Sequence, residues 1–274
     1  MTAVHTVVEA AADRLELAAR TGVGCAPVRD ILGATDIASA YAVQETVIQR
    51  RVAAGARIVG RKIGLTSPAV QRQLGVDQPD FGVLLDDMDV SAMPEVPVGR
   101  LLQPKAEAEI AFRLGSDLTD GPLTAATVAD AVIGAAAAIE IVDSRVARWD
   151  ITITDTVADN GSSGLFVVSD TWLPLAALTP RAVTMRMFLR TPGGADELVS
   201  EGIGAACLGD PLEALAWLAR TARELGQPLT AGQIVLSGAL GPMVAVPPGA
   251  SVRAELTTLG PVSARFAEKE RTAE

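Results

Sequence analysis

The segment from Lys105 to Phe112 alternates between small or apolar residues and charged ones with a period of two. Side chains at every second position of a β-strand share a face, so this period predicts a strand. One face carries Ala106, Ala108, Ile110 and Phe112, and the other carries Lys105, Glu107 and Glu109. Glu107 and Glu109 would then project in the same direction, about 7 Å apart, where one divalent ion can bridge them. A solvent-facing strand edge would show the same charged alternation and stays open as an alternative.

Glu140 is the second unusual carboxylate, because it interrupts the run from Ala135 to Val142, which is otherwise apolar throughout. A carboxylate in such a buried segment needs a partner. An ion pair with Arg145 and a place in a metal site would satisfy that need equally well. Three carboxylates without a histidine form an oxygen-ligand site of the kind that binds Mg²⁺ or Mn²⁺.

The beginning of the chain has a helical pattern. Apolar residues recur at helical spacing from Val4 to Ala18 and again from about Asp36 to Ala54, with Gly55 placed to end the second helix. Residues 1–56 are therefore predicted to form a helical N-terminal region. A strand-rich domain of residues 57–266 and a charged tail of residues 267–274 are predicted to follow.

The strand-rich part mixes strands and helices without strict strand–helix alternation, and it contains no Gly-rich nucleotide-binding motif or nucleophile elbow. Strands are predicted at 57–65, within 94–114, and at 139–143, 183–189, 232–236 and 251–256. Helices are predicted at 67–74, from about residue 124 through the alanine-rich run, and from Pro211, capped by Asp210, to before Gly226. Residues 76–82 are predicted to be a loop. The expected fold class is α+β.

Composition excludes several functions. Lys and Arg number 23 against 33 Asp and Glu, without a long basic run, so nucleic acid is not an expected partner. No apolar run is long enough to span a membrane, and the N-terminus lacks a signal-peptide pattern, so we expect a cytoplasmic protein. The single histidine, His5, excludes a Ser-His-Asp triad or a multi-histidine zinc site. Cys25 and Cys207 are predicted to be buried thiols without a catalytic role.

Two further charged residues stand in unusual settings. Lys62 lies between Gly60 and Gly64 in an apolar strand, where it is either buried for function or extended to the surface. Asp80 lies beside proline and glycine, where most aspartates only cap a turn. Residues 155–164 supply hydroxyls, amides and backbone N–H groups suited to a small anion, although a plain loop has the same composition.

Six ordered segments carry a resemblance to a known family. They are GRKIGLTS (60–67), GVDQPDFG (75–82), LLQPKAEAEIAF (101–112), AIEIVDSR (138–145), DTVADNGSSG (155–164) and SGALGPM (237–243). Together they cover nearly the whole chain, which resembles the 2-keto-4-pentenoate hydratase family of the fumarylacetoacetate hydrolase superfamily. The sister 2-oxo-3-hexenedioate (4-oxalocrotonate) decarboxylases share the ExE and DSR segments, but the QPD and LLQPK motifs are closer to those of the hydratases.

The resemblance implies a mixed β-sandwich-like roll of the fumarylacetoacetate hydrolase C-terminal type that holds Mg²⁺ or Mn²⁺. Glu107, Glu109 and Glu140 match its metal-ligand positions, Lys62 and Asp80 match pocket positions, and Ser163 matches a position near the substrate carboxylate. It also implies a homo-oligomer, usually a pentamer or decamer. The expected reaction adds water to 2-hydroxypenta-2,4-dienoate in aromatic meta-cleavage catabolism, with Asp80 as general base and Lys62 orienting the substrate or moving protons.

Three other functions remain as alternatives. The first is decarboxylation of 2-oxo-3-hexenedioate, which uses the same metal site. The second is a non-catalytic subunit that scaffolds a neighbouring pathway enzyme, although the intact charged residues argue against it. A C–C hydrolase is the weakest, because its histidine-bearing, water-activating machinery has no counterpart in a chain whose one histidine is His5.

Overall fold

The computed structural model describes residues 3–67, 71, 76 and 78–268. The helices are α1 (Ala3–Thr21), α2 (Arg29–Leu32), α3 (Ile37–Ala53), α5 (Ala125–Ala131), α6 (Ile153–Ala158) and α7 (Pro211–Glu224). The strands are β1 (Ile58–Gly64), β2 (Asp80–Leu85), β3 (Lys105–Leu114), β4 (Val132–Val142), β5 (Ser163–Val168), β6 (Thr184–Arg190), β7 (Glu197–Ile203), β8 (Ile234–Leu236), β9 (Val244–Ala245), β10 (Ser251–Leu256) and β11 (Gly260–Arg265). Short 3₁₀ turns include η2 (Val98–Arg100) and η4 (Asn160–Ser162).

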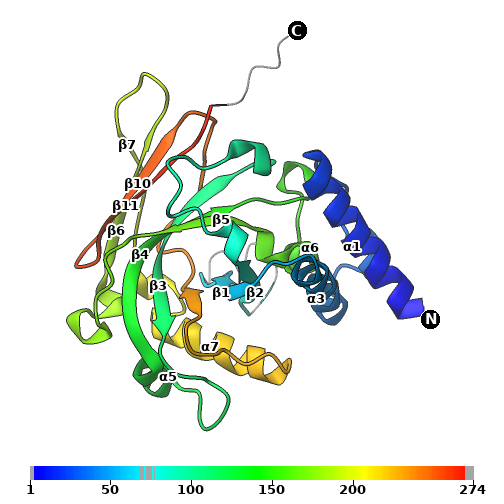
Figure 1. The fold of residues 1–274 in the computed structure, drawn as a ribbon, viewed down its shortest axis with the longest axis horizontal. Coiled ribbons are helices and arrows are strands. Elements are labelled where there is room, and N and C mark those ends of the chain that lie inside the picture. The colour runs from blue at the N-terminus through cyan, green and yellow to red at the C-terminus, as the bar shows by residue number, and fades with distance from the viewer. Residues whose placement is uncertain (1–2, 68–70, 72–75, 77, 269–274) are drawn as a thin grey trace.

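The larger sheet has the strand order β2-β1-β8-β3-β4-β5, and β9 pairs with β3 at its beginning. Only the β1–β8 pair is parallel, so the sheet is mixed. Its long central hairpin, β3 and β4, curves through the molecule, with β1 and β2 toward the N-terminal helices and α5 and α7 at one end (Figure 1). Within the hydrogen-bonded order of the sheet, β8 lies between the hairpin of β1 and β2 and the hairpin of β3 and β4.

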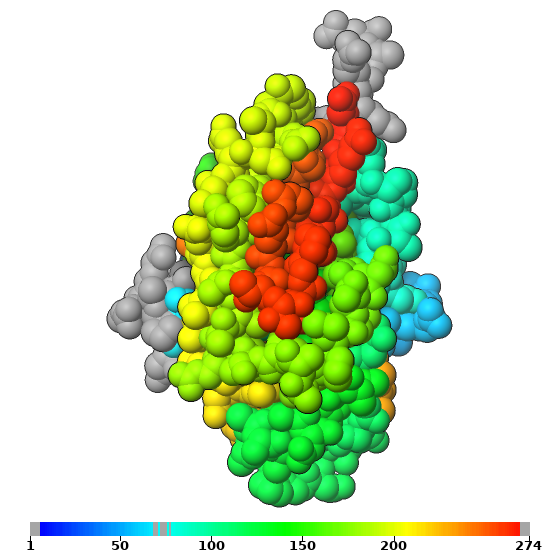
Figure 2. All heavy atoms as spheres, turned by 90° about the vertical axis from the view of Figure 1, so that its left-hand side faces the viewer, coloured from blue at the N-terminus to red at the C-terminus, as the bar shows by residue number. Residues whose placement is uncertain are grey.

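The smaller sheet is antiparallel, in the order β11-β10-β6-β7, and β10 and β11 pack against β4. Figure 2 shows its outer face, where the orange and red spheres of β10 and β11 lie beside the yellow-green and yellow spheres of β6 and β7. Alternating residues of each strand, such as Met185 and Met187 on β6 and Val252 and Ala254 on β10, point inward and are buried. The alanines of β4, Ala135–Ala138, are fully buried in the main core, where small side chains permit close packing of the neighbouring layers.

A second core holds the N-terminal helices together. Apolar residues of α1, α2, α3 and α6, among them Leu15, Val43 and Val157, form this cluster on one side of the larger sheet (Figure 1). Asp36 caps α3, its carboxylate accepting a hydrogen bond from Ser39 N. Both predicted N-terminal helices are confirmed to within three residues of their expected ends. No described helix is both long and apolar enough to cross a membrane.

The structure corrects several predicted elements. The alanine-rich helix ends at Ala131, because Ala135–Ala138 belong to β4, and the predicted strand at 139–143 is only its last part. Residues 80–82, predicted to be a loop, begin β2, and residues 94–104 are not strand. The strands β5, β7 and β11 and the helix α6 were not predicted. Cys207 is buried as expected, but Cys25 is only half-buried; both are free thiols.

Other predictions agree with the structure or lie outside it. The strands β1, β6, β8 and β10 and the helix α7 occur where they were expected, and Asp210 accepts a hydrogen bond from Leu212 N at the start of α7. The predicted helix at 67–74 and the end of the charged tail fall mainly outside the described residues. The predicted domain boundaries stay predictions.

Candidate metal centre and active site

The central hairpin brings three glutamates together. Glu107 of β3 and Glu140 of β4 are direct partners in the antiparallel register, and Glu109 lies two residues further along the same face of β3. One carboxylate oxygen from each of the three lies within 4.8 Å of the others. Glu109 and Glu140 are buried, so the alternative of a solvent-facing strand edge is wrong for Glu109.

Several carboxylate oxygens of the cluster receive no hydrogen bond from the described residues. Such oxygens test whether a cation fits among the glutamates. Glu109 Oε2 accepts a hydrogen bond from Gly238 N at 2.7 Å, but Glu109 Oε1 and both oxygens of Glu140 have no hydrogen-bond donor among the described residues. Unpaired buried carboxylate oxygens are costly, because they have lost water and gained no replacement. Oxygen ligands aimed at one point, with no nitrogen or sulfur among them, suit a hard divalent cation. The residues therefore fit Mg²⁺ or Mn²⁺.

The electrostatics of the glutamates agree with this geometry. Burial, with the charge of Glu140, raises the pKa of Glu107 to about 7. Burial and the neighbouring glutamates likewise raise the pKa of Glu109 well above its ordinary value. Burial raises the pKa of Glu140, although Lys62 opposes the shift. Without a cation, the hairpin therefore concentrates carboxylates that resist ionisation.

Lys62 completes the charge pattern from the neighbouring hairpin. It lies in β1 and is buried, and its Nζ is 3.4 Å from Glu140 Oε1. Burial alone would lower its pKa, but the charges of Glu140 and Asp80 raise that pKa above its ordinary value. Lys62 is therefore a buried ammonium beside the glutamates, and the alternative in which it extends to the surface is wrong. The predicted ion pair between Glu140 and Arg145 is also wrong, because Arg145 pairs with Asp159.

Asp80 lies on the same face of the β1–β2 hairpin as Lys62, at the register position opposite Gly64. A Cβ on Gly64 would lie 2.1 Å from Asp80 Oδ1 and 3.3 Å from Lys62 Nζ, so the missing side chain leaves room for both groups. Asp80 is buried, Thr156 Oγ1 donates to its Oδ2 at 3.4 Å, and its Oδ1 has no hydrogen-bond partner in residues 3–67, 71, 76 and 78–268. Burial raises its pKa, opposed by Lys62. It is no ordinary turn cap.

Ser163 begins β5, after a turn that packs against Lys62 and Gly82. Three consecutive residues of this turn, Asn160, Gly161 and Ser162, have left-handed backbones with φ of 56°, 62° and 54°. Gly161 packs against Lys62, since a Cβ there would lie 2.8 Å from Lys62 Cε. The Ser163 hydroxyl donates to Asn160 O at 2.7 Å. Ser163 therefore stabilises the turn and lies behind Gly161, rather than pairing with Lys62.

Asn160 is a structural residue of the site that the sequence analysis missed. Its side chain accepts a hydrogen bond from Val83 N at 2.7 Å and donates one to Val83 O at 2.9 Å, which ties the turn to β2. Asparagine tolerates the left-handed backbone better than most residues. The Asn160-Gly161 dipeptide is a known turn signal and could have indicated this conformation.

Comparison with known proteins places the chain in context. Residues 73–267 match the family model described as the C-terminal domain of fumarylacetoacetate (FAA) hydrolase. The chain is 51% identical to the "TodF product hydratase" of Pseudomonas putida, with 97% of this chain and 98% of that protein covered. It is 52% identical to "2-keto-4-pentenoate hydratase 1" of Dechloromonas aromatica, with 94% and 97% covered.

A solved structure shares the whole architecture. The 4-oxalocrotonate decarboxylase from Pseudomonas putida G7, complexed with magnesium and adipate, superimposes with a TM-score of 0.88 at 32% identity. The match covers 97% of this chain and 99% of the other. The expected fold, a helical N-terminal region followed by a mixed β-roll, is thereby confirmed.

Proposed function

This chain belongs to the 2-keto-4-pentenoate hydratase family, within the fumarylacetoacetate hydrolase superfamily, and we propose that its buried glutamate cluster is the metal site of a hydro-lyase. The substrate is 2-hydroxypenta-2,4-dienoate, the enol form of 2-keto-4-pentenoate, and the product is 4-hydroxy-2-oxopentanoate. The observation that carries the proposal is the set of buried oxygens on Glu109 and Glu140 that receive no hydrogen bond from any described residue, beside Lys62 and close to Glu107. Identity of about half to hydratases over nearly the full chain supports the same reaction.

Glu107, Glu109 and Glu140 would hold Mg²⁺ or Mn²⁺, since they supply only carboxylate oxygens. When bound, such a cation would polarise the carboxylate and C2 oxygens of the substrate as a Lewis acid. Lys62 would stay protonated beside Glu140 and orient the substrate anion, because the surrounding carboxylates raise its pKa.

Asp80 is the proposed acid–base residue. Ketonisation removes the proton of the C2 hydroxyl and adds a proton at C5, which leaves 2-oxopent-3-enoate. Hydration then places the hydroxyl of water on C4 and a proton on C3. Both steps need a group that accepts and returns a proton, and burial raises the pKa of Asp80 toward the range where a carboxylate can do so. Its Oδ1 has no hydrogen-bond partner in the described part of the chain and faces the same glycine as Lys62 Nζ.

The turn of Asn160, Gly161 and Ser162 forms the wall behind Lys62, and Ser163 braces that wall through its hydrogen bond to Asn160 O. We propose that the carboxylate end of the substrate lies at this wall, where Gly161 packs against Lys62. Ser163 would then act on the substrate mainly through the position of the turn.

The deciding experiment is a panel of 2-hydroxydienoates assayed with Mg²⁺ and with Mn²⁺. Loss of dienol absorbance should accompany formation of 4-hydroxy-2-oxopentanoate from the five-carbon monoacid. Release of CO₂ from the six-carbon diacid 2-oxo-3-hexenedioate, with no hydration of the monoacid, would instead identify a decarboxylase, the activity of the solved structural relative. Turnover of neither substrate by the metal-loaded protein would favour the non-catalytic scaffold.

We also propose that the chain works in the cytoplasm as a homo-oligomer of five or ten copies, beside a neighbouring pathway enzyme. The resemblance to the hydratases supports this assembly. Light scattering coupled to gel filtration measures the copy number directly. Co-purification with an enzyme that consumes 4-hydroxy-2-oxopentanoate tests the association.

A further inference from the structure

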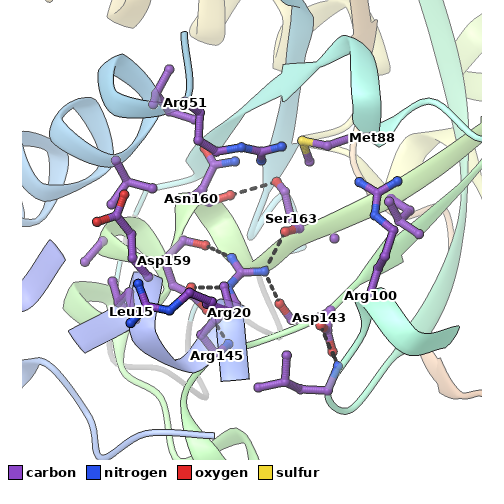
Figure 3. A pocket seen from close by; sticks show the side chains of 18 residues that line it. Leu15, Arg20, Arg51, Met88, Arg100, Asp143, Arg145, Asp159, Asn160 and Ser163 are labelled. Carbon is purple, nitrogen blue, oxygen red and sulfur yellow. Dashed lines mark hydrogen bonds and ion pairs between the residues drawn. The ribbon is translucent and has the colours of Figure 1, made fainter. Parts of the chain in front are cut away.

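A second hollow lies on the far side of the turn formed by residues 160–162. Its volume is about 520 Å³, within the range of small-molecule sites. Its wall includes Asp159, Asn160 and Ser163, but none of the three glutamates, Lys62 or Asp80 lines it. Figure 3 shows this hollow, with Arg145 in the middle of the view and Arg20, Arg51 and Arg100 around it. It is a separate cavity from the metal centre.

Four arginines from separate parts of the fold meet at this hollow, although the chain as a whole carries a net charge of -10. Arg20 comes from α1, Arg51 from α3, Arg100 from η2, and Arg145 follows β4. Arg145 is already used: it donates to Asp159, Asp143 O and Ser163 O (Figure 3). It fixes the wall and is not the free donor.

The other three arginines keep donors available. Arg51 uses only Nη2, on the carboxylate of Asp87, and Arg100 approaches that carboxylate at 3.8 Å without a hydrogen bond. Arg20 has no hydrogen bond or ion pair with any described residue. Guanidinium groups with unused donors around a hollow attract an anion.

The acids of the hollow do not compete for these donors. Glu16 pairs with Arg50, which lies outside the lining, and Asp159 pairs with Arg145. Asp143 accepts hydrogen bonds from the backbone N–H groups of Leu102 and Gln103. Each carboxylate therefore has hydrogen-bond partners away from Arg20, Arg51 and Arg100, and the lining carries four arginines against these three carboxylates.

The hollow also has an apolar floor. Ile48, Met88 and Leu165 line it, and all three are buried. A purely inorganic anion would leave this floor without a partner, whereas a neutral apolar molecule would leave the guanidinium donors unused. We propose that this hollow is a second binding site, distinct from the metal centre, for an organic carboxylate with an apolar body.

The position of the site gives its occupant contact with the catalytic pocket. The turn of residues 160–162 contributes Asn160 to the wall of the hollow, and the next residue of the turn, Gly161, packs against Lys62. A carboxylate bound against Asn160 and Ser163 therefore shares a wall with the pocket. Binding of a ligand in the hollow is expected to change the environment of Gly161 without any contact between the ligand and the glutamates.

Hexanoate is a suitable probe, with 1-hexanol and inorganic phosphate as the neutral and the non-apolar comparisons. Titration calorimetry should be carried out on the full-length protein in its native assembly, after chelation and again with Mg²⁺. We expect saturable hexanoate binding that is equal in both conditions, and binding of each comparison compound at least about tenfold weaker. Arg20→Gln or Arg100→Gln should weaken hexanoate binding by about tenfold, whereas Arg181→Gln, an exposed arginine outside the hollow, should not.

Methyl and amide NMR signals locate the bound probe. The Met88 methyl and the Gly161 amide should shift with hexanoate, while the Met187 methyl, in the core beside β10, should not. Binding that requires Mg²⁺, that survives both arginine substitutions, or that leaves Met88 unchanged would place hexanoate elsewhere and overturn the proposal. Absence of saturable binding would overturn it as well, even in a protein that hydrates its substrate normally. The proposed function is tested separately by the substrate panel.

Discussion

Glu107 and Glu140 face each other across the central hairpin as direct antiparallel partners. Like charges in that position repel, and burial strengthens the repulsion because no solvent screens it. Lys62 offsets part of the charge through Glu140, but Glu109 adds a third carboxylate on the same face. The three carboxylates therefore favour cation binding and destabilise the metal-free hairpin. This leads to the first two predictions.

Removal of the metal should abolish activity and lower the melting temperature together. Chelation is expected to stop hydration, and Mg²⁺ or Mn²⁺ to restore it. Because a cation binds the folded chain, a metal concentration about 100 times Kd should raise Tm by roughly 5 to 10 °C. Differential scanning calorimetry with and without chelator measures the shift. Full activity of verifiably metal-free protein would contradict the assignment.

Glu107→Gln should weaken metal binding and yet stabilise the metal-free fold. The substitution removes one of the repelling buried charges, so we expect a gain of about 1 kcal/mol, or about 2 to 4 °C in the Tm of the chelated protein. Glu197→Gln, at an exposed position of β7, is the matched control and should change neither quantity. If the variant binds Mg²⁺ as tightly as the parent in calorimetry, Glu107 is not a metal ligand.

Lys62→Ala and Asp80→Asn should separate binding from chemistry. Neither residue is a proposed ligand, so metal affinity is expected to stay close to that of the parent, while kcat falls by about 10² to 10⁴. Solvent-deuterium exchange into C5 of the substrate follows ketonisation apart from hydration and shows which half-reaction each residue serves. Parental turnover in both variants would remove them from the proton-transfer steps.

Gly64→Ala should damage catalysis by steric displacement alone. The new Cβ would overlap Asp80 Oδ1, so the carboxylate must move, and a displacement near 1 Å can cost about 10²-fold in rate. Gly99→Ala is the control, because a Cβ at Gly99 meets no atom within 4 Å. Metal affinity should be unchanged in both variants. Equal kcat values for the two would show that the Asp80 position is not critical.

Asp159 should titrate well above an ordinary aspartate. Burial raises its pKa to about 6, although Arg145 opposes the shift, so Arg145→Gln should raise the pKa further. A carboxyl that binds its proton more tightly in the folded chain favours folding most below its unfolded pKa of about 3.8. That contribution is lost as pH rises through about 6. Carboxyl ¹³C NMR on labelled protein measures the midpoint, and a value near 4 would show that the group is well solvated.

Much of the metal centre follows from local sequence pattern. The period-two alternation of Lys105–Phe112 predicts that Glu107 and Glu109 share a strand face, and the structure has that arrangement. Glu140 is conspicuous because it interrupts an apolar run, and it is buried as expected. Its partner was not predictable, because Lys62 comes from a distant strand, while Arg145, nearer in sequence, is turned toward Asp159.

The errors come from long-range packing. Ala135–Ala138 favour a helix by intrinsic propensity, but a central strand covered by a second layer also requires small side chains, and tertiary packing decides. The strand β2 was missed because Asp80-Phe81-Gly82 has the composition of a turn, and its strand conformation depends on pairing with β1. The left-handed turn at Asn160 likewise depends on two hydrogen bonds to Val83.

The position of β8 has a consequence for synthesis of the chain. The three-residue strand Ile234–Leu236 is the link that joins the hairpin of Lys62 and Asp80 to the hairpin of the glutamates. A growing chain that ends before Ile234 can form both hairpins but lacks the strand that aligns them, so their apolar edges stay open to other chains. Alignment of the two halves of the site therefore has to wait until Ile234–Leu236 is free to pair with both β1 and β3.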